Sequence, residues 1–305
     1  MQNHLPLGVL LSLLGAFFYA AQTGVIKLGV GHLPPLPVIV FVQSAVALIL
    51  MLPVIFRKGF SDARDIFVVK RFPLHVVRAI FSLLISYALF YAVAFIPLVN
   101  AMLLVNTAPL IVPLLGRIFL GEKINHRLWL PILIGFIGVV LVLHPGTHFF
   151  NIAALFALAA AFCMSASLLS VRQLSKTDSP KKIAFWFFLL STIISGAVAL
   201  FFWMPISLKA LGLMSVVGVF YFLTQYTMAS ALKYANAQLV GSLFYATIIF
   251  AAIFSFIFAH ILPSGLTLCG MMLVILGGIA CVLTERRTLK KSAVKKEQTG
   301  YVYEN

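Results

Sequence analysis

Three very long runs without a charged residue constrain this chain more than any other feature. They cover Ala79–Gly116, Leu128–Val171 and Tyr234–Thr284. A helix needs about 20 apolar residues to cross the hydrocarbon core of a bilayer, so a single helix cannot account for any of these runs. Proline and glycine supply a break within each run, at Pro97, at His144-Pro145-Gly146 and at Pro263-Ser264-Gly265. Each run therefore predicts two membrane-crossing helices.

The composition is that of an integral membrane protein. Hydrophobic residues make up 62% of the 305 residues, charged residues only 10%, and the mean hydropathy is +1.10. We predict an all-α integral membrane protein with ten transmembrane helices, at 6–27, 34–56, 75–95, 97–118, 128–145, 150–171, 182–203, 210–232, 235–259 and 264–284. The first segment resembles a signal peptide, but it lacks a positively charged start, so we interpret it as a helix of the mature protein.

The distribution of lysine and arginine predicts the orientation in the membrane. The net charge is +15, but the basic residues form short clusters between apolar segments, which argues against nucleic-acid binding. If both termini are cytoplasmic, the clusters in 57–71, 123–127, 176–182 and 286–296 all lie inside, and only Lys27 and Lys209 lie outside. The basic cytoplasmic tail, 287–305, either contacts anionic lipid or serves only to orient the chain, and the second interpretation is the simpler one.

A weak internal repeat divides the chain into two halves. Shifting Tyr87–Leu143 by 139 positions places it on Tyr226–Val282, with Leu104 on Leu243 and Gly138 on Gly277. The first helices of each half match at an offset of 145, which places Ala16-Phe17 on Ala161-Phe162. Because each half has an odd number of helices, the halves enter the membrane from opposite sides. We therefore predict two inverted five-helix repeats, 1–146 and 147–286.

The stretch Val105–Lys123 places polar residues and prolines inside an apolar segment. It reads VNTAPLIVPLLGRIFLGEK, and such groups are tolerated at membrane depth only where protein or a water-filled cavity satisfies them. We interpret Glu122-Lys123 as its cytoplasmic end. Together with the Gly-rich segment at Gly135 and Gly138, this stretch resembles the EamA family of the drug/metabolite transporter (DMT) superfamily.

This resemblance covers nearly the whole chain and implies transport of a small metabolite across the bacterial inner (plasma) membrane. Members of that family often repeat the proline and the Gly-Glu pair in the second half. Here Ile248 and His260-Ile261 occupy those positions, so we expect the two halves to be functionally unequal.

Polar residues inside the predicted helices are the candidates for a substrate site. They are Tyr19, Gln43, Arg78, Ser82, Ser86, Asn106, Tyr221, Gln225 and Tyr245. Arg78, Ser82 and Ser86 share one stripe of a helix, and the repeat pairs Ser82 with Tyr221 and Ser86 with Gln225 across the pseudo-axis. Pro109 and Pro113 remove backbone hydrogen bonds beside Asn106, so they are either a hinge or a static kink.

Structural roles compete with substrate binding at several of these positions. Membrane serines usually bond to their own helix backbone or allow close packing, and Tyr19 could be a core aromatic residue. Buried glutamine and asparagine are costlier, which favours a cavity lining for Gln43, Asn106 and Gln225. Arg78 lies one turn inside the predicted boundary, so snorkelling to head groups competes with a role in substrate binding or gating.

We predict a secondary transporter that works by alternating access, in the direction of export. All seven acidic residues fall outside the predicted helices, which favours a neutral, zwitterionic or anionic solute such as an amino acid over a cationic drug. Uptake or exchange of a nucleotide derivative such as S-adenosylmethionine is an alternative, and a non-transporting membrane scaffold is another. We expect no enzymatic activity, no cofactor and no metal site, because neither catalytic motifs nor metal-ligand spacings occur. The expected partners are a small-molecule substrate and membrane lipid, for a monomer or a homodimer.

Overall fold

The protein is a bundle of helices throughout the part of the chain that the structure describes. The structure, a computed structural model, describes residues 5–56, 66–121, 127, 129–143, 152–231, 234, 240, 243–259 and 264–300. Its α-helices are α1 (Leu5–Leu28), α2 (Leu36–Phe56), α4 (Phe72–Phe95), α5 (Leu98–Val105), α6 (Ala108–Leu120), α7 (Trp129–Leu143), α8 (Ile152–Leu174), α9 (Pro180–Ala199), α10 (Leu208–Ala231), α12 (Ala246–Ala259) and α13 (Gly265–Gly300). A short 3-10 helix, η3 (Leu200–Phe202), follows α9.

Most of these helices have the length and apolarity of membrane-spanning segments. Within the described residues, seven helical segments are long and apolar enough to cross a membrane, and Trp129–Leu141, Ala246–Phe258 and Gly265–Ala280 are shorter apolar helices. Many large apolar side chains are exposed on the outside, among them Phe95, Ile118 and Leu276. A surface of this kind suits a lipid environment and not water. The prediction of an all-α membrane protein is confirmed.

Local sequence signals explain where several helices begin and end. The side chain of Ser179 accepts a hydrogen bond from the backbone N–H of Lys182 and caps α9, and Pro180 occupies its first turn. The backbone of α6 ends at Gly121, which adopts a left-handed φ of 65°. The residue Ile96, which precedes Pro97, is extended and ends α4.

The segment predicted as one helix over 97–118 is broken in its middle. Helix α5 ends at Val105, the chain turns at Asn106 and Thr107, and α6 begins at Ala108. A second turn lies at Tyr245, directly before α12, and the 139-residue offset makes Tyr245 the counterpart of Asn106. Described residues thus contain two helix breaks at corresponding places in the two halves of the sequence.

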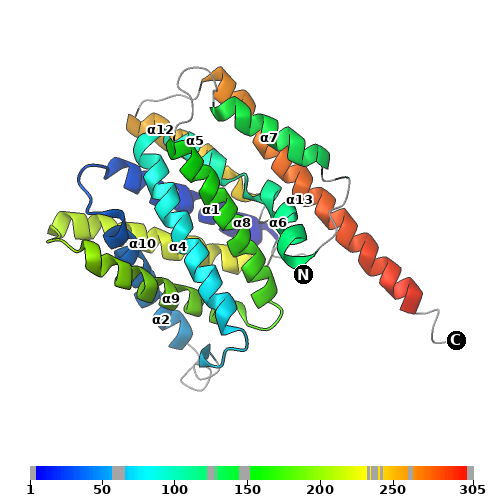
Figure 1. Cartoon of the computed structure of the whole chain (residues 1–305), viewed down its shortest axis with the longest axis horizontal. Coiled ribbons are helices and arrows are strands. Elements are labelled where there is room, and N and C mark those ends of the chain that lie inside the picture. Colours follow the sequence, from blue (N-terminus) through cyan, green and yellow to red (C-terminus); the bar gives the residue numbers. More distant parts are fainter. Residues whose placement is uncertain are drawn as a thin grey trace.

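The helices pack around α5, and each contacts a few specific neighbours. Helix α4 lies along α8, α1 along α10, α2 along α9 and α10, and α7 along α13 (Figure 1). Helices α5 and α6 both contact α8, and α12 contacts both α1 and α5. Seven of the eight residues of α5 are buried, so this short helix lies at the centre of the core.

Helices α7 and α13 approach each other through glycines, as expected for the Gly-rich segments. A Cβ atom at Gly138 would lie 2.7 Å from the backbone oxygen of Gly270, and one at Gly277 would lie 2.7 Å from the backbone nitrogen of Gly135. Only glycine permits this contact. Gly278 differs, because its hydrogen faces the ring of Tyr245 instead of α7.

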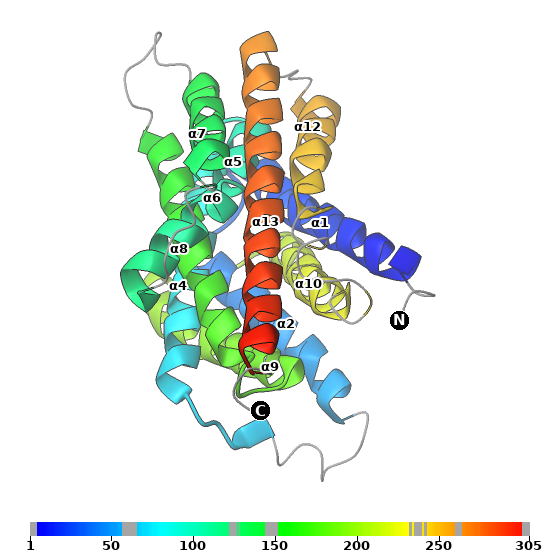
Figure 2. The same cartoon turned by 90° about the vertical axis from the view of Figure 1, so that its right-hand side faces the viewer.

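Helix α13 does not end at the predicted membrane boundary near residue 284. It continues to Gly300, through the basic segment that we predicted as a tail, and Figures 1 and 2 show it as the longest helix, with its C-terminal part reaching away from the bundle in Figure 1. The segment holds no proline and is rich in lysine, arginine and glutamate, which are good helix formers.

Candidate functional site

A chain of buried amide and hydroxyl groups crosses the bundle from α1 to α4. Nε2 of Gln22 donates to Oε1 of Gln43 over 3.1 Å, and Nε2 of Gln43 donates to Oγ of Ser86 over 3.3 Å. Gln22 is 2% exposed and Gln43 is fully buried. Burying three polar side chains is costly unless they are paired, so the network fixes the relative positions of α1, α2 and α4.

One acceptor of this network has no partner. Oε1 of Gln22 is buried and makes no hydrogen bond within the described part of the chain. Sequence reasoning selected Gln43 and Ser86, and the structure brings them together with Gln22. The side chain of Ser82, one turn from Ser86, instead lies 3.0 Å from the hydroxyl of Ser167 on α8. An unpaired buried amide oxygen is suited to accept a hydrogen bond from a solute.

Arg78 points into the bundle and not toward the membrane surface. It is 8% exposed, Nη1 donates to the backbone oxygen of Ile183 over 2.9 Å, and the guanidinium carbon lies 4.5 Å from the ring centroid of Phe187. The snorkelling interpretation is therefore wrong, because α9 covers the side chain. Its Nε makes no hydrogen bond, and no carboxylate of the described residues forms an ion pair with it. A buried cation without a carboxylate partner is costly unless something else neutralises it.

Two predicted tyrosines lie within electrostatic range of one another beside Arg78. Tyr221 interacts electrostatically with both Arg78 and Tyr19, and its ring packs against Phe187 and Phe188 of α9. The ring of Tyr19 stacks on Phe244. These contacts bring residues from α1, α4 and α10 to one region.

The pairs suggested by the repeat do not bond to each other. Ser82 and Ser86 bond toward α8 and α2, while Tyr221 lies against α9. Gln225 is half-buried and makes no hydrogen bond with described residues. Helices α4 and α10 are separated by α2 and α9, which pack between them.

Asn106 connects the two helix breaks. Its Nδ2 donates to the backbone oxygen of Met102 over 2.7 Å and to Oγ1 of Thr247 over 2.9 Å. Thr247 lies in the first turn of α12, two residues after the turn at Tyr245. The asparagine thus satisfies a carbonyl at the end of α5 and holds the start of α12 against it.

The two prolines occupy different positions relative to the break. Pro109 lies in the first turn of α6, where its missing N–H is not needed, and Pro113 lies inside α6. Oγ of Ser165 donates to the backbone oxygen of Ala108 over 2.9 Å and supports the start of α6 from α8. Whether Pro109 and Pro113 act as a hinge stays a prediction.

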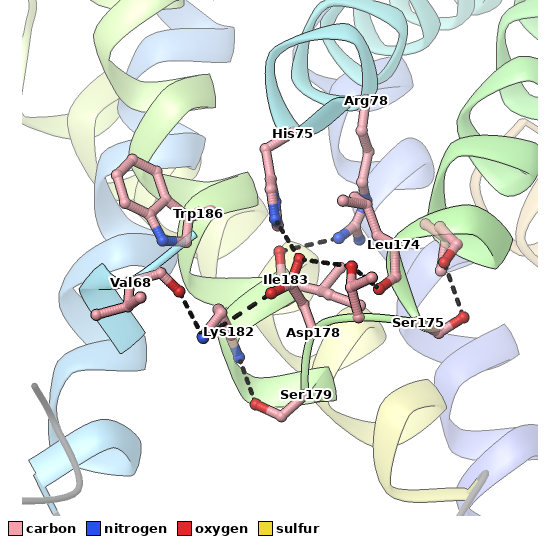
Figure 3. Close-up of polar contacts among 12 residues, drawn as sticks. Val68, His75, Arg78, Leu174, Ser175, Asp178, Ser179, Lys182, Ile183 and Trp186 are labelled. Atoms are coloured by element: carbon pink, nitrogen blue, oxygen red, sulfur yellow. Dashed lines mark hydrogen bonds and ion pairs between the residues drawn. The ribbon is translucent and has the colours of Figure 1, made fainter. Parts of the chain in front are cut away.

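Sequence reasoning missed a buried His–Asp pair at one end of the bundle. Nε2 of His75 lies 3.3 Å from Oδ2 of Asp178, and the two residues are 0% and 6% exposed (Figure 3). Asp178 does fall in a loop, between α8 and α9, but the loop folds inward against α4. The sequence signal that could have revealed the pair is His75 itself, a polar residue that lies on the same helix face as Arg78 and is the fourth residue of an apolar helix.

Further hydrogen bonds join the same end to the chain before α4. Nζ of Lys182 donates to the backbone oxygen of Val68 over 2.7 Å (Figure 3). Nε1 of Trp186 donates to the backbone oxygen of Ile66 over 2.8 Å. Nζ of Lys182 also lies 3.8 Å from Oδ1 of Asp178.

Some predicted positions lie outside the described residues, and none of the others forms a metal site. Glu122, Lys123 and His260 are among those not described. The described residues contain no group of three or more histidine, cysteine or acidic side chains that could hold a metal ion.

Long apolar helices, two of them interrupted beside buried polar groups, define a multi-pass membrane protein of the transporter class. The family comparison agrees. The model of the EamA-like transporter family matches residues 6–144 and 151–284, and the chain belongs to this family. It is therefore a small-molecule transporter and not an enzyme.

Several named bacterial transporters are similar to this chain. The pseudopaline exporter CntI of Pseudomonas aeruginosa is 28% identical over 283 residues, which are 92% of this chain and 96% of that protein. A riboflavin transporter of Vibrio cholerae is 29% identical over 68% of this chain and 69% of that protein. An S-adenosylmethionine uptake transporter of Rickettsia bellii is 21% identical over 71% and 75%. One solved structure has the same fold, with a TM-score of 0.61 and 18% identity over 94% of this chain and 99% of its own.

Proposed function

We propose that this protein exports a small carboxylate-bearing metabolite, zwitterionic or anionic, by alternating access across the bacterial inner membrane. The two halves rock about a site that includes Arg78, Tyr221, Tyr19 and the Gln22–Gln43–Ser86 network. The single observation that carries the proposal is the buried guanidinium of Arg78, which has no carboxylate partner among the described residues.

The packing of the helices supports an inverted repeat. If each helix is replaced by its counterpart in the other half, the α4–α8 contact becomes the α10–α1 contact, and the α6–α8 contact becomes the α12–α1 contact. The α2–α9 and α7–α13 pairs each consist of two counterparts, so this replacement leaves them the same. The largest contacts follow this exchange, as expected for two repeats that pack around a pseudo-two-fold axis, whereas the smaller α1–α4 and α2–α4 contacts have no comparable counterparts between α8 and α10 or between α9 and α10.

The two helix breaks support a site near the middle of the membrane. Discontinuous helices leave backbone groups unpaired where they line a substrate site, and neighbouring side chains satisfy those groups in the absence of substrate. Asn106 and Thr247 have this position, with one residue from each half. Moving the halves apart would separate this pair.

The groups at the site favour a solute with both a carboxylate and a hydrogen-bond donor. A guanidinium binds a planar carboxylate through two parallel hydrogen bonds, and the unpartnered Oε1 of Gln22 would accept one from an ammonium or hydroxyl group. The guanidinium would repel a cationic drug. Metabolites with an α-amino acid moiety carry both complementary groups.

We propose export as the direction of transport, with both termini of the chain in the cytoplasm. The basic connections support this orientation, because Lys176, Lys181 and Lys182 all lie at or beside the α8–α9 connection. The similar pseudopaline exporter, which this chain covers almost completely, supports export as the direction.

The test is a thermal-shift screen in which each carboxylic acid is paired with its amide. We expect purified protein to be stabilised by some acids and not by their amides, and the stabilisation to disappear in Arg78→Gln. Lys176→Gln is the matched control, because Lys176 is exposed and bonds only to Gln173. Equal stabilisation by acid and amide, or an undiminished shift in Arg78→Gln, would contradict the proposal. Counterflow of the identified acid in proteoliposomes then tests transport itself.

A further inference from the structure

One end of the bundle is held closed by contacts between the two halves of the chain. Helix α4 and the segment before it belong to the first half, and the α8–α9 connection with α9 belongs to the second. His75 contacts Asp178, Arg78 donates to Ile183 and Lys182 donates to Val68 (Figure 3). Trp186 donates to Ile66. We call this set of eight residues the latch. Opening a path between the halves at this end requires that all of these contacts separate.

One contact of the latch is between two titratable groups that are shielded from water. The side chain of His75 is 0% exposed and that of Asp178 is 1% exposed. The carboxylate also accepts a bond of 3.4 Å from the hydroxyl of Thr177, and the charged groups that act on His75 are Asp178, Arg78 and Lys182. The other interhalf contacts of the latch use backbone oxygens and side chains that do not titrate near neutral pH.

The corresponding place at the opposite end of the bundle is apolar. The offset of 139 makes Met214 the counterpart of His75, and the offset of 145 makes Leu33 the counterpart of Asp178. Met214 is fully buried, Leu33 is partly buried, and both belong to the main apolar core. At these corresponding places, the described residues hold a titratable pair at one end of the bundle and apolar side chains at the other.

We propose that the His75–Asp178 pair makes the latch sensitive to protons, so that acidification of the adjacent compartment favours opening of this end of the transporter. The inference rests on the proposed function, in which this end faces the cytoplasm. When the latch opens, water solvates both groups and the imidazole takes up a proton from that compartment. When the latch closes, the imidazolium returns this proton to the same compartment and the imidazole is buried in its neutral form.

The direction of the effect follows from the charges in the latch. Burial of the imidazole and the nearby cations Arg78 and Lys182 oppose an imidazolium in the closed latch, and together they outweigh its attraction to Asp178. His75 is therefore neutral when the latch is closed, and the buried carboxylate is also stabilised by Thr177 and by Lys182 at 3.8 Å. Histidine changes its charge between about pH 5 and pH 8. Opening is therefore linked to the uptake of a proton and becomes easier as the pH falls.

Cysteine labelling tests this without any substrate. The side chain of Ile183 is 4% exposed beneath the latch, whereas Ser175 is exposed nearby. In a background without the native cysteines, the rate at which a water-soluble maleimide labels Ile183→Cys is divided by the rate for Ser175→Cys. The division removes the intrinsic effect of pH on thiol reactivity. We expect the ratio to fall by about tenfold between about pH 5.5 and about pH 8, within the limit that linkage of one proton sets.

Variants separate the pair from a general effect of pH. In His75→Gln we expect a low ratio that no longer depends on pH, with monodisperse elution as the check of folding. His32→Gln is the control, because His32 is exposed and lies in the α1–α2 connection, and it should keep the response of the unmodified protein. A pH-independent ratio with His75 and Asp178 intact, or an unchanged response in His75→Gln, would overturn the proposal.

A transport measurement distinguishes this inference from the proposed function. Counterflow of a carboxylate identified in the screen should fall as the pH rises in the protein with its native His75, and should be flat over the same range in His75→Gln. If no carboxylate is transported while the labelling ratio still depends on His75, the proposed function fails and the latch stands. If counterflow occurs but the labelling ratio and its pH profile do not depend on His75, the latch fails and the proposed function stands.

Discussion

Nδ2 of Asn106 donates a 2.9 Å hydrogen bond to Oγ1 of Thr247, and this bond joins the break between α5 and α6 to the first turn of α12. The two residues are 141 positions apart in the chain, and both are at least 96% buried. Polar contacts at a helix break serve two purposes in a membrane protein. They satisfy backbone groups that lipid cannot satisfy, and they hold two segments that alternating access would move.

Removing the Thr247 hydroxyl should destabilise the closed arrangement. Thr247→Val keeps the shape of the side chain and leaves Nδ2 of Asn106 with only its bond to Met102. Hydrogen bonds between membrane helices are worth about 0.6 kcal/mol on average and up to about 1.7. We expect a loss of that size in the free energy of unfolding in detergent. Thr192→Val is the control, since Thr192 bonds only within its own helix. An equal loss in both variants would show that the contact between the breaks contributes nothing.

Replacing Gln43 should impair both the stability of the protein and transport. Gln43→Leu fills a similar volume but leaves both Gln22 and Ser86 without their shared partner. Each unpaired buried group costs about 1–3 kcal/mol. Transport by reconstituted protein should fall by about tenfold, which corresponds to about 1.4 kcal/mol, if the network positions the solute. Ser170→Ala is the control, because Ser170 bonds only to the backbone of its own helix. Unchanged transport in Gln43→Leu would remove this network from the site.

A methyl group at Gly138 should force α7 and α13 apart. The Cβ of Gly138→Ala would lie 2.7 Å from the backbone oxygen of Gly270 and 2.8 Å from the backbone nitrogen of Val274, and neither backbone atom can move independently. Overpacking of this kind costs about 1–3 kcal/mol, which thermal unfolding would detect. Gly212→Ala is a matched control in a helix with open space at that position. Alanine there should stabilise by about 0.5–1 kcal/mol, because it restricts the unfolded chain. A harmless Gly138→Ala would mean that the two helices are not in close contact.

Trp186 should stabilise the latch independently of pH. Trp186→Phe keeps an aromatic ring but removes the 2.8 Å bond from the indole to the backbone oxygen of Ile66. We expect the labelling ratio of Ile183→Cys to rise by about fivefold at every pH, in line with the loss of a hydrogen bond worth about 1 kcal/mol. The change of the ratio with pH should be retained, because His75 and Asp178 are unaltered. If Trp186→Phe abolished the pH response, the indole and not the His–Asp pair would be the source of that response.

The sequence by itself determined the class of protein and the nature of its helices. Apolar runs of this length can satisfy their backbone groups in lipid only as helices, so the runs alone predict a membrane protein. The stretch that begins at Val105 also indicated the family and a bend beside Asn106, because polar residues and prolines at that depth need support from neighbouring segments. Local propensity and length were sufficient for these predictions.

Only the tertiary structure decided which side chains meet. Arg78 could snorkel or point inward, and the choice depends on α9, which supplies the oxygen of Ile183 and the ring of Phe187. The His75–Asp178 pair joins residues that are 103 positions apart, and Asp178 belongs to a loop whose inward fold no local pattern predicts. Hydropathy records how apolar a segment is, but not which helices adjoin it. The partners of a buried charge are therefore a property of the packed bundle, in which long-range contacts determine where each polar group finds its counterpart.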